Sequence, residues 1–386
     1  MTAFRDVFER FLATHASRQV KGLMSATAVL DFAVSSIALF EPIYLYALGW
    51  SLASICAFYL AIYALTFFLL PFGARYVGRL GFQHAMLFSS PFLIVYFLAL
   101  YAIPRHPAFI GLAVVAFAVQ KILYWPAFHA EMARFGRDGE RGREVSNMAS
   151  LASFATILGP TFGGVLIGLY GFPVAFIAAS LLILASNIPL ISIPEERSKD
   201  GFAYLPALKR VFSKERRADL AAMSGFGEEF VVQAIWPIFL FVTLKGFAAT
   251  GVVVSVSILL TTLTMLFIGR ITDLQSRHAV MRTGAIFTSF SWALRPFLIG
   301  PLGVLAGDFF YRASRSLLGI PMMAVLYERV SKGPFFERLI SLEMSIMLGK
   351  ALMMAVGVVV AMIWPDAFLP FFVLAAIFSL LYAKLP

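Results

Sequence analysis

The sequence repeats itself at a spacing of 195 residues. Pro42-Ile43-Tyr44-Leu45-Tyr46 returns as Pro237-Ile238-Phe239-Leu240-Phe241, and the same spacing relates Pro126 to Pro321. The spacing is about half of the 386-residue chain. We therefore expect one half copied twice, so that each half must fold in the same way and the two must face each other.

The amino-acid composition indicates the structural class of the repeated half. Sixty per cent of the residues are apolar and the mean hydropathy is +0.86, which is outside the range of soluble domains. A membrane-spanning helix needs about 20 mostly apolar residues. We predict an all-α integral membrane protein with twelve transmembrane helices in two pseudo-symmetric six-helix bundles, a construction typical of secondary transporters. The predicted spans lie near residues 22–47, 50–72, 84–103, 107–129, 145–169, 172–193, 218–244, 248–269, 280–299, 301–324, 336–364 and 367–384.

The positive charge of the chain, net +10, indicates its topology. With the N-terminus inside, 24 of the 31 lysines and arginines fall in internal segments and only Arg105, Lys245 and the borderline Arg295 are external. This is the positive-inside pattern. We expect both termini in the cytoplasm, a location in the cytoplasmic (inner) membrane, and contact of the basic residues with lipid headgroups rather than nucleic acid.

The spans divide the chain into four parts. Residues 1–21 are a cytoplasmic N-terminal segment, 22–193 the first bundle, 194–217 a cytoplasmic linker with an amphipathic helix near 204–212, and 218–386 the second bundle. Cys56 is the only cysteine, so neither a disulfide framework nor a thiol metal cluster is expected. Motifs for metalloproteases, nucleophile elbows, P-loops and dinucleotide binding are absent. We expect no cofactor and no enzymatic activity.

Three motifs resemble those of the major facilitator superfamily. They are Trp125 to Glu131 followed by Glu140-Arg141-Gly142-Arg143, then Gly159-Pro160-Thr161-Phe162-Gly163-Gly164, and then Gly269 to Arg277. In residues 74–81 the chain departs from the family pattern, because Gly78 replaces the acidic residue. The resemblance covers essentially the whole chain and implies alternating access of a small molecule between two rocking halves.

The resemblance assigns a gating role to the loop signatures. It implies that Arg79, Gly81, Gly269, Asp273 and Arg277 hold the cytoplasmic gate, with Asp273 as the main carboxylate of an asymmetric latch. The alternative is that the arginines only fix topology.

The fifth-span motif is typical of antiporters in the resembled family, and its four residues Gly159, Pro160, Gly163 and Gly164 are also predicted to take part in gating. Gly159, Gly163 and Gly164 let two helices touch, and Pro160 removes one helical hydrogen bond. Helix packing alone explains this motif equally well.

Ionisable residues within spans are expensive and mark pathways or pairs. Most of them fall in spans one, four, seven and ten, which the resemblance makes the cavity-lining helices. Asp31 and Glu229 are predicted as proton carriers, because burial among apolar side chains favours the neutral carboxyl. Glu228 is the other candidate for proton coupling and is predicted as the partner of a basic residue. The alternative for Asp31 is a salt bridge to Lys121 or to an arginine of span ten, and Glu41 is expected to be solvated near the outer surface.

The remaining polar residues of these spans are predicted to bind substrate. Asp308, Arg312 and Arg315 share one helix face, and the two guanidinium groups suit an anion or a carboxylate; the alternative is a closed ion network. Glu343 and Lys350 in span eleven are predicted to form a structural pair. The other predicted substrate-binding residues are Gln120, Lys121, Tyr124, Gln233 and Trp236.

We therefore expect a proton-coupled secondary transporter for an amphiphilic, zwitterionic or anionic small organic molecule, with export by antiport slightly favoured. The alternatives are a proton-coupled importer of an organic anion and a non-transporting sensor or lipid-binding protein with the same fold. The expected partners are the substrate, protons or sodium, and membrane lipids, and the expected state is a monomer. Closed salt bridges throughout the cavity would favour the sensor, and unpaired carboxylates would favour transport.

Overall fold

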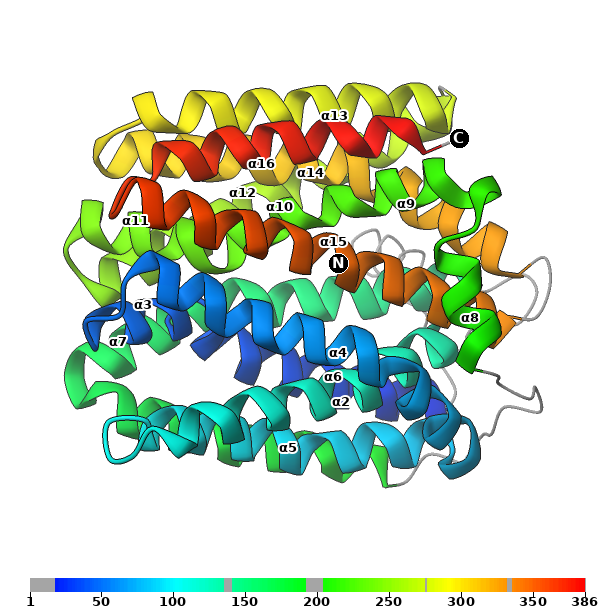
Figure 1. Ribbon diagram of the computed structural model, residues 1–386, viewed down its shortest axis with the longest axis horizontal. Helices are drawn as coiled ribbons and strands as arrows, with labels where there is room; N and C mark the ends of the chain where they lie inside the picture. The colour runs from blue at the N-terminus through cyan, green and yellow to red at the C-terminus, as the bar shows by residue number, and fades with distance from the viewer. Residues whose placement is uncertain (1–17, 135–140, 192–203, 275, 332–334, 386) are drawn as a thin grey trace, which may run out of the picture.

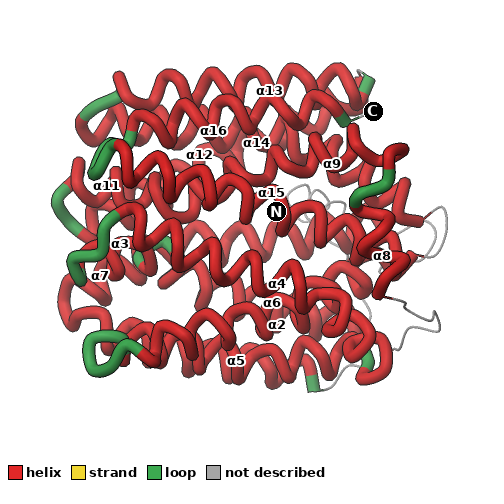
Figure 2. Tube along the Cα trace, viewed as in Figure 1, coloured by secondary structure: helices red, strands yellow, loops and turns green. Residues whose placement is uncertain are grey.

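The computed structural model describes residues 18–134, 141–191, 204–274, 276–331 and 335–385. Within these ranges all regular structure is helical and no strand occurs (Figures 1 and 2). The long helices run roughly parallel to one axis. The predicted all-α membrane fold is confirmed.

The first half is built from six helical elements. They are α2 (Arg18–Ala38), α3 (Glu41–Ala47), α4 (Leu52–Leu80), α5 (Phe82–Ala102), α6 (Ala108–Arg134) and α7 (Arg141–Leu190). Within α7, Gly171 has φ +78°, which breaks this 50-residue element into two spans.

The second half follows a short linker helix, α8 (Tyr204–Val211), which confirms the helix expected there. Its elements are η1 (Lys214–Arg216), α9 (Arg217–Ser224), η2 (Gly225–Gly227), α10 (Glu228–Phe230), η3 (Val231–Ile235), α11 (Trp236–Leu244), α12 (Phe247–Leu274), α13 (Arg277–Leu294), η4 (Arg295–Phe297), α14 (Gly300–Ser331), α15 (Phe335–Ile363), α16 (Leu369–Leu381) and η5 (Tyr382–Lys384).

Eight of the described helices are long and apolar enough to cross a membrane. One of them, Ser153–Leu190, is the double span broken at Gly171. With α13, α14 and α16, which are shorter or more polar, these described helices make up the twelve expected spans.

Spans one and seven are not the continuous helices that the sequence predicts. The copied prolines, Pro42 and Pro237, each lie in the first turn of a new helix, α3 or α11. Proline lacks the N–H that would continue the preceding helix but fits the first turn of the next. In span seven the preceding turn, Val231–Ile235, is π-helical. In each of these spans, therefore, regular α-helix is interrupted just before the copied proline.

The two halves meet mainly where α7 packs on α12 and α4 packs on α15, and also where α6 contacts α15 and α3 contacts η3 and α11. In Figure 1, α4 and α15 lie next to each other at the middle of the molecule. The linker helix α8 packs on α15 and α4 at one end of the bundle, here called the linker end. The α3 and α11 helices lie at the opposite end.

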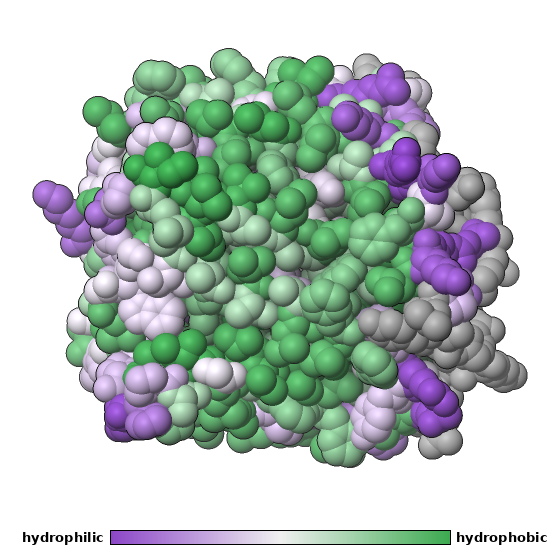
Figure 3. Space-filling model, viewed as in Figure 1, coloured by the Kyte–Doolittle hydropathy of each residue, from purple (hydrophilic) through white to green (hydrophobic). Residues whose placement is uncertain are grey.

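Apolar and hydrophilic surface residues are separated along the direction in which the long helices run. Figure 3 shows apolar residues across the middle of this face, while hydrophilic residues gather toward the two ends, above all at the linker end. Exposed apolar side chains such as Phe68, Leu169 and Ile188 are expected where a helix faces lipid. The chain is a multi-pass membrane protein.

Candidate functional site

A fully buried carboxylate, Glu228, lies at the centre of the second half. It is the first residue of α10, directly after the 3-10 turn Gly225–Gly227. Its side chain has no exposed surface and accepts hydrogen bonds from Arg315 Nε at 3.1 Å, the Tyr311 hydroxyl at 2.9 Å and Trp292 Nε1 at 3.1 Å. A buried charge with this many donors is compensated.

The adjacent Glu229 is placed differently. Its carboxylate accepts from Arg315 Nη2 at 2.8 Å and from Lys350 Nζ at 2.8 Å, and 24% of its side chain remains exposed. Arg315 also donates to the Tyr382 hydroxyl at 3.2 Å. Glu229 therefore joins a cation on α14 to a cation on α15 and still reaches solvent.

A second buried carboxylate, Asp308, lies one turn before Arg312 on α14. It accepts from Arg312 Nε at 2.6 Å, from Trp236 Nε1 at 2.8 Å and from Arg295 Nη2 at 3.4 Å. The guanidinium carbon of Arg295 lies 3.8 and 3.9 Å from the ring centres of Trp236 and Trp292. Arg295, which the sequence gives as a borderline external residue, is fully buried, and aromatic rings enclose its charge.

The first half holds charges without such compensation. Asp31 on α2 is half-buried, and its carboxylate has no hydrogen bond or ion pair in the described chain. The salt bridge from Asp31 to Lys121 or to an arginine of span ten is not formed. Tyr124 lies near Asp31 and stacks on Phe128 with ring centres 5.6 Å apart.

Lys121 on α6 also has no carboxylate partner among the described residues. Its ammonium lies 4.2 Å from the ring centre of Phe117 and 5.1 Å from that of Tyr63. Its sequence neighbour Gln120 is buried at 7% exposure. Aromatic faces stabilise an ammonium but leave its charge unneutralised.

Tyr63 on α4 connects the uncompensated half to the compensated one. Its hydroxyl donates to Gln233 Oε1 at 3.1 Å, across the interface between the halves. Lys350 Nζ lies 5.4 Å from the ring centre of Tyr63, and Lys121 lies 5.1 Å from it. Two ammonium groups from opposite halves therefore lie near a single ring.

Glu41 is a further buried carboxylate, although the sequence places it near the outer surface. It is 5% exposed and accepts hydrogen bonds from Tyr59, at 2.6 Å, and from Tyr96. The Tyr59 ring in turn lies 5.7 Å from that of Phe230 in the other half. The expectation of a solvated Glu41 is wrong, because α3 turns its first residue inward.

Comparison with known proteins agrees with this arrangement. The family described as Major Facilitator Superfamily matches residues 22–218, just over half of the chain. The chain belongs to the major facilitator superfamily. A crystal structure of a POT family transporter in complex with 5-aminolevulinic acid superposes with TM-score 0.72, covering 95% of this chain and 94% of that one. Sequence identity is 11%, so the likeness concerns the fold. No curated protein sequence matches the chain.

The superfamily's fifth-span motif lies where backbones touch. A Cβ added to Gly163 would lie 1.7 Å from the Ser36 carbonyl oxygen, and one added to Gly159 would lie 1.9 Å from Ser35 Oγ. Both contacts hold α7 against α2. The motif therefore packs helices, and its role in gating remains a prediction.

The same motif also joins the two halves. A Cβ on Gly164 would lie 2.5 Å from the Phe247 carbonyl oxygen, and a Cβ on Gly251 would lie 2.1 Å from that of Pro160. Thr161 N donates to Ser255 Oγ at 3.1 Å at the same crossing. Glycine and proline therefore bring α7 and α12 into backbone contact.

The superfamily's loop signatures are only partly described. Arg79 and Arg277 are exposed, and Gly81 ends α4 with φ +105°. Gly269 and Asp273 lie in α12, but their surroundings fall outside the described residues. The asymmetric latch on Asp273 stays a prediction. At the linker end the halves meet through Phe82 and Phe336, whose ring centres are 5.9 Å apart.

Span eleven also departs from the sequence prediction. Glu343 and Lys350 do not pair with each other: Glu343 lies 3.2 Å from His129 on α6, and Lys350 holds Glu229. The contact between Glu343 and His129 adds a second link between the halves toward the linker end. In the described part of the chain no group of three or more histidine, cysteine, aspartate or glutamate residues is arranged to hold a metal ion.

Sequence reasoning missed several residues of the site. Glu41, Arg295 and Lys350 are ionisable residues inside or beside predicted spans. Since such residues are costly in a membrane, their positions alone could have assigned them to the site. Tyr63 and Trp292 are two of 58 aromatic residues, and nothing in their local sequence separates them from packing residues. Contacts between distant helices define their place in the site.

Proposed function

We propose that this superfamily member is a proton-coupled secondary transporter that carries a small organic anion or zwitterion by alternating access. One observation carries the proposal: Glu229 is shared between Arg315 and Lys350 and is partly exposed. A proton on that carboxylate removes its negative charge and leaves two cations without their counter-charge. A substrate anion can then take the place of Glu229.

The surroundings of Glu229 support an anionic substrate group. Lys350 and Lys121 both lie near the Tyr63 ring, and Lys121 has no acidic partner in the described structure. Guanidinium and ammonium groups bind carboxylates and phosphates strongly. The bound molecule in the structural neighbour, 5-aminolevulinic acid, is a zwitterion and agrees with this class.

The geometry favours movement of proton and substrate in the same direction. When Glu229 is ionised, its carboxylate neutralises Arg315 and Lys350, and the substrate anion cannot bind to them. When Glu229 is protonated, both cations are available to the substrate anion. Proton and anion therefore bind together and are released together when the halves exchange their contacts. In a cell with an inward proton gradient and the linker end in the cytoplasm, this is import.

Export by proton antiport is the second candidate, and the Gly-Pro-x-x-Gly-Gly element of span five favours it. The unpaired Asp31 supports either form of transport over a non-transporting sensor, because a closed ion network would have engaged it. The direction of proton movement separates the two candidates.

Proteoliposomes with a pH-sensitive dye inside test the coupling. Adding a transported anion outside should acidify the lumen under symport and make it more alkaline under antiport. Glu229→Gln mimics the protonated side chain, so we expect binding of the anion to persist while substrate-driven proton movement falls at least about tenfold. Asp366→Asn is the matched control, since Asp366 is exposed and asparagine tolerates its positive φ of 59°. Unchanged proton movement in Glu229→Gln would exclude the proposed role.

Asp31→Asn tests the second proposed proton carrier. The substitution keeps the shape of the side chain and removes its charge, and no ion pair is broken in the described structure. We expect normal thermal stability together with a large loss of proton-driven uptake. Exchange of labelled for unlabelled substrate at equal pH, which needs no net proton movement, should be retained. Loss of this exchange as well would show that Asp31 serves substrate binding or folding instead.

A further inference from the structure

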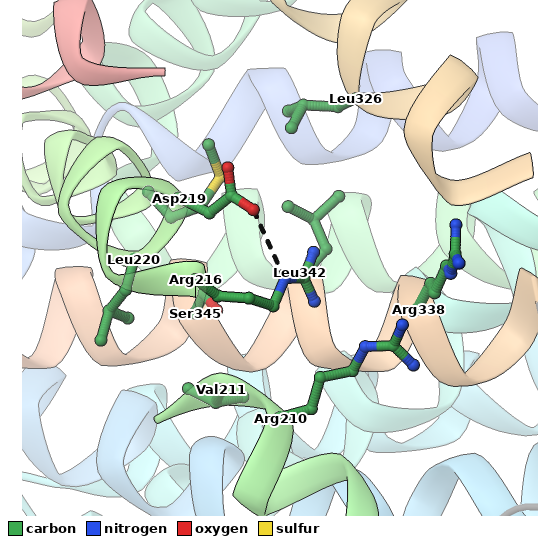
Figure 4. Close-up of a pocket in the computed structure, with 10 residues that line it drawn as sticks. Arg210, Val211, Arg216, Asp219, Leu220, Leu326, Arg338, Leu342 and Ser345 are labelled. Atoms are coloured by element: carbon green, nitrogen blue, oxygen red, sulfur yellow. Dashed lines mark hydrogen bonds and ion pairs between the residues drawn. The ribbon is translucent and has the colours of Figure 1, made fainter. Parts of the chain in front are cut away.

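A cavity at the linker end lies apart from the ion network around Glu229. Its volume is about 280 Å³, and it lies between α8, the start of α9, the end of α14 and the start of α15. Figure 4 shows the side chains of Arg210, Arg216 and Arg338 reaching it from three different elements. None of these arginines takes part in the proposed transport step.

Among the described residues that line this cavity, arginines outnumber acidic residues. Arg210 Nη1 contacts Glu337 at 2.6 Å, and Arg216 Nε contacts Asp219 at 3.4 Å. Arg338 is the third arginine of the lining, and Asp219 is its acidic residue. Of the Arg216 guanidinium, Nε holds Asp219, and the two terminal nitrogens form no hydrogen bond with the described residues. Donors in this fork geometry fit tetrahedral and planar oxyanions in a bidentate manner.

The opposite wall of the cavity is apolar. Val211, Met223 and Leu326 are 2%, 1% and 5% exposed, and Leu342 completes this wall. Ligand pockets for drug-sized molecules start at about 300 Å³, so this cavity holds a headgroup-sized anion rather than a large substrate. A basic rim with an apolar wall at the end of a membrane bundle is suited to a phosphate group that carries an organic substituent.

We propose that this cavity binds a phosphate group, supplied either by the headgroup of an anionic phospholipid or by a soluble phosphorylated molecule. The bound phosphate links Arg210 of the linker helix to Arg216 and to Arg338 of α15. It thereby fixes α8, the described α-helix of the linker between the halves, against the second half. The same ligand restrains α9, whose C-terminal end leads directly into the turn before Glu228.

Thermal unfolding of the full chain in neutral detergent tests this site. The probes are inorganic pyrophosphate, short-chain phosphatidylglycerol and short-chain phosphatidylcholine with the same acyl chains, all at ionic strength matched with chloride. A ligand that binds only the folded protein raises its unfolding temperature in a saturable manner. Stabilisation by pyrophosphate identifies a soluble ligand, and stabilisation by phosphatidylglycerol alone identifies a lipid headgroup.

Two substitutions connect that stabilisation to the arginines. Arg216→Gln should raise the concentration needed for half-maximal stabilisation about tenfold or more, because a charge-assisted bidentate contact is lost. Arg216→Lys keeps the charge but not the fork and should give an intermediate shift. Arg217→Gln is the matched control, since Arg217 is the next residue, is exposed and does not line the cavity.

Three outcomes would overturn the proposal. They are no saturable shift with any probe, equal shifts with phosphatidylglycerol and phosphatidylcholine, or an unchanged response in Arg216→Gln. If Arg216→Gln is already unfolded without ligand, Arg338→Gln takes its place in the same measurement, because it removes a positive charge from a different helix. Transport assays are not needed for any of these readings, so the result does not depend on the proposed coupling through Glu229.

Discussion

Arg315→Met should destabilise this protein more than any other single exchange of a charged residue. Arg315 is the only described cation in contact with Glu228, whose carboxylate has no exposed surface. Removing one partner of a buried ion pair costs about 3–5 kcal/mol, because the remaining charge is uncompensated. The hydrogen bonds to Glu229 and Tyr382 are lost as well. The expected result is a large drop in the unfolding temperature of the purified protein.

A second substitution separates charge from packing. Glu228→Gln in the Arg315→Met background removes the uncompensated charge, and Trp292 and Tyr311 can still donate to the amide oxygen. We expect this double variant to regain most of the lost stability. Arg105→Met is the control, because Arg105 is exposed and contacts only Tyr101 among the residues for which contacts are described. Equal losses in Arg315→Met and Arg105→Met would show that the ion pair does not stabilise the second half.

Gly251→Ala should separate the two halves where α7 and α12 cross. The added Cβ would lie 2.1 Å from the Pro160 carbonyl oxygen. This oxygen belongs to the backbone, so it cannot move aside as a flexible side chain could. Overpacking of this kind costs about 1–3 kcal/mol. Because 1.4 kcal/mol is a factor of ten in an equilibrium constant, the constant for closing this contact should fall about fivefold to a hundredfold. Transport that needs this closed contact should fall with it.

Labelling of an introduced cysteine measures that opening. Ser255 is 7% exposed and lies at the crossing, whereas Cys56, the native cysteine, is fully buried. In Ser255→Cys, a maleimide should react slowly, and adding Gly251→Ala should accelerate the reaction. Gly168→Ala is the matched control, since no atom lies within 4 Å of the position its Cβ would take. Similar labelling rates in the two glycine variants would contradict a closed contact at this crossing.

The fold could be predicted because its determinants are local or periodic. Apolar length gives the spans, and the spacing of 195 residues relates the two halves. The interruptions of regular α-helix in spans one and seven could have been predicted too, since Pro42 and Pro237 follow them. That the turn before Pro237 is π-helical could not, because no local residue pattern indicates it.

The sequence predicted that Glu228 has a basic partner, and Arg315 fills this role, but which charges pair between helices could be predicted only in part. Asp308 and Arg312 are four residues apart and form the contact that this spacing allows. Glu343 and Lys350 share a helix face but lie about 10 Å apart along the axis, so each finds a nearer partner on another helix. The same holds for Arg295, whose aromatic enclosure joins residues from α11, η4, α13 and α14. Such contacts depend on packing between helices.

The charge network of the second half also constrains how the chain can be made. The predicted span within α14 carries three ionisable side chains, Asp308, Arg312 and Arg315, each of which costs at least about 2.5 kcal/mol in an isolated inserting helix. Its carboxylate and guanidinium partners, Glu228, Glu229 and Arg295, all precede it in the sequence. When α14 leaves the ribosome these counter-charges have already been synthesised, whereas Lys350 arrives later. Biogenesis of the second half must therefore retain α10 and α13 beside the insertion machinery until α14 joins them, so that these helices enter the lipid as a group.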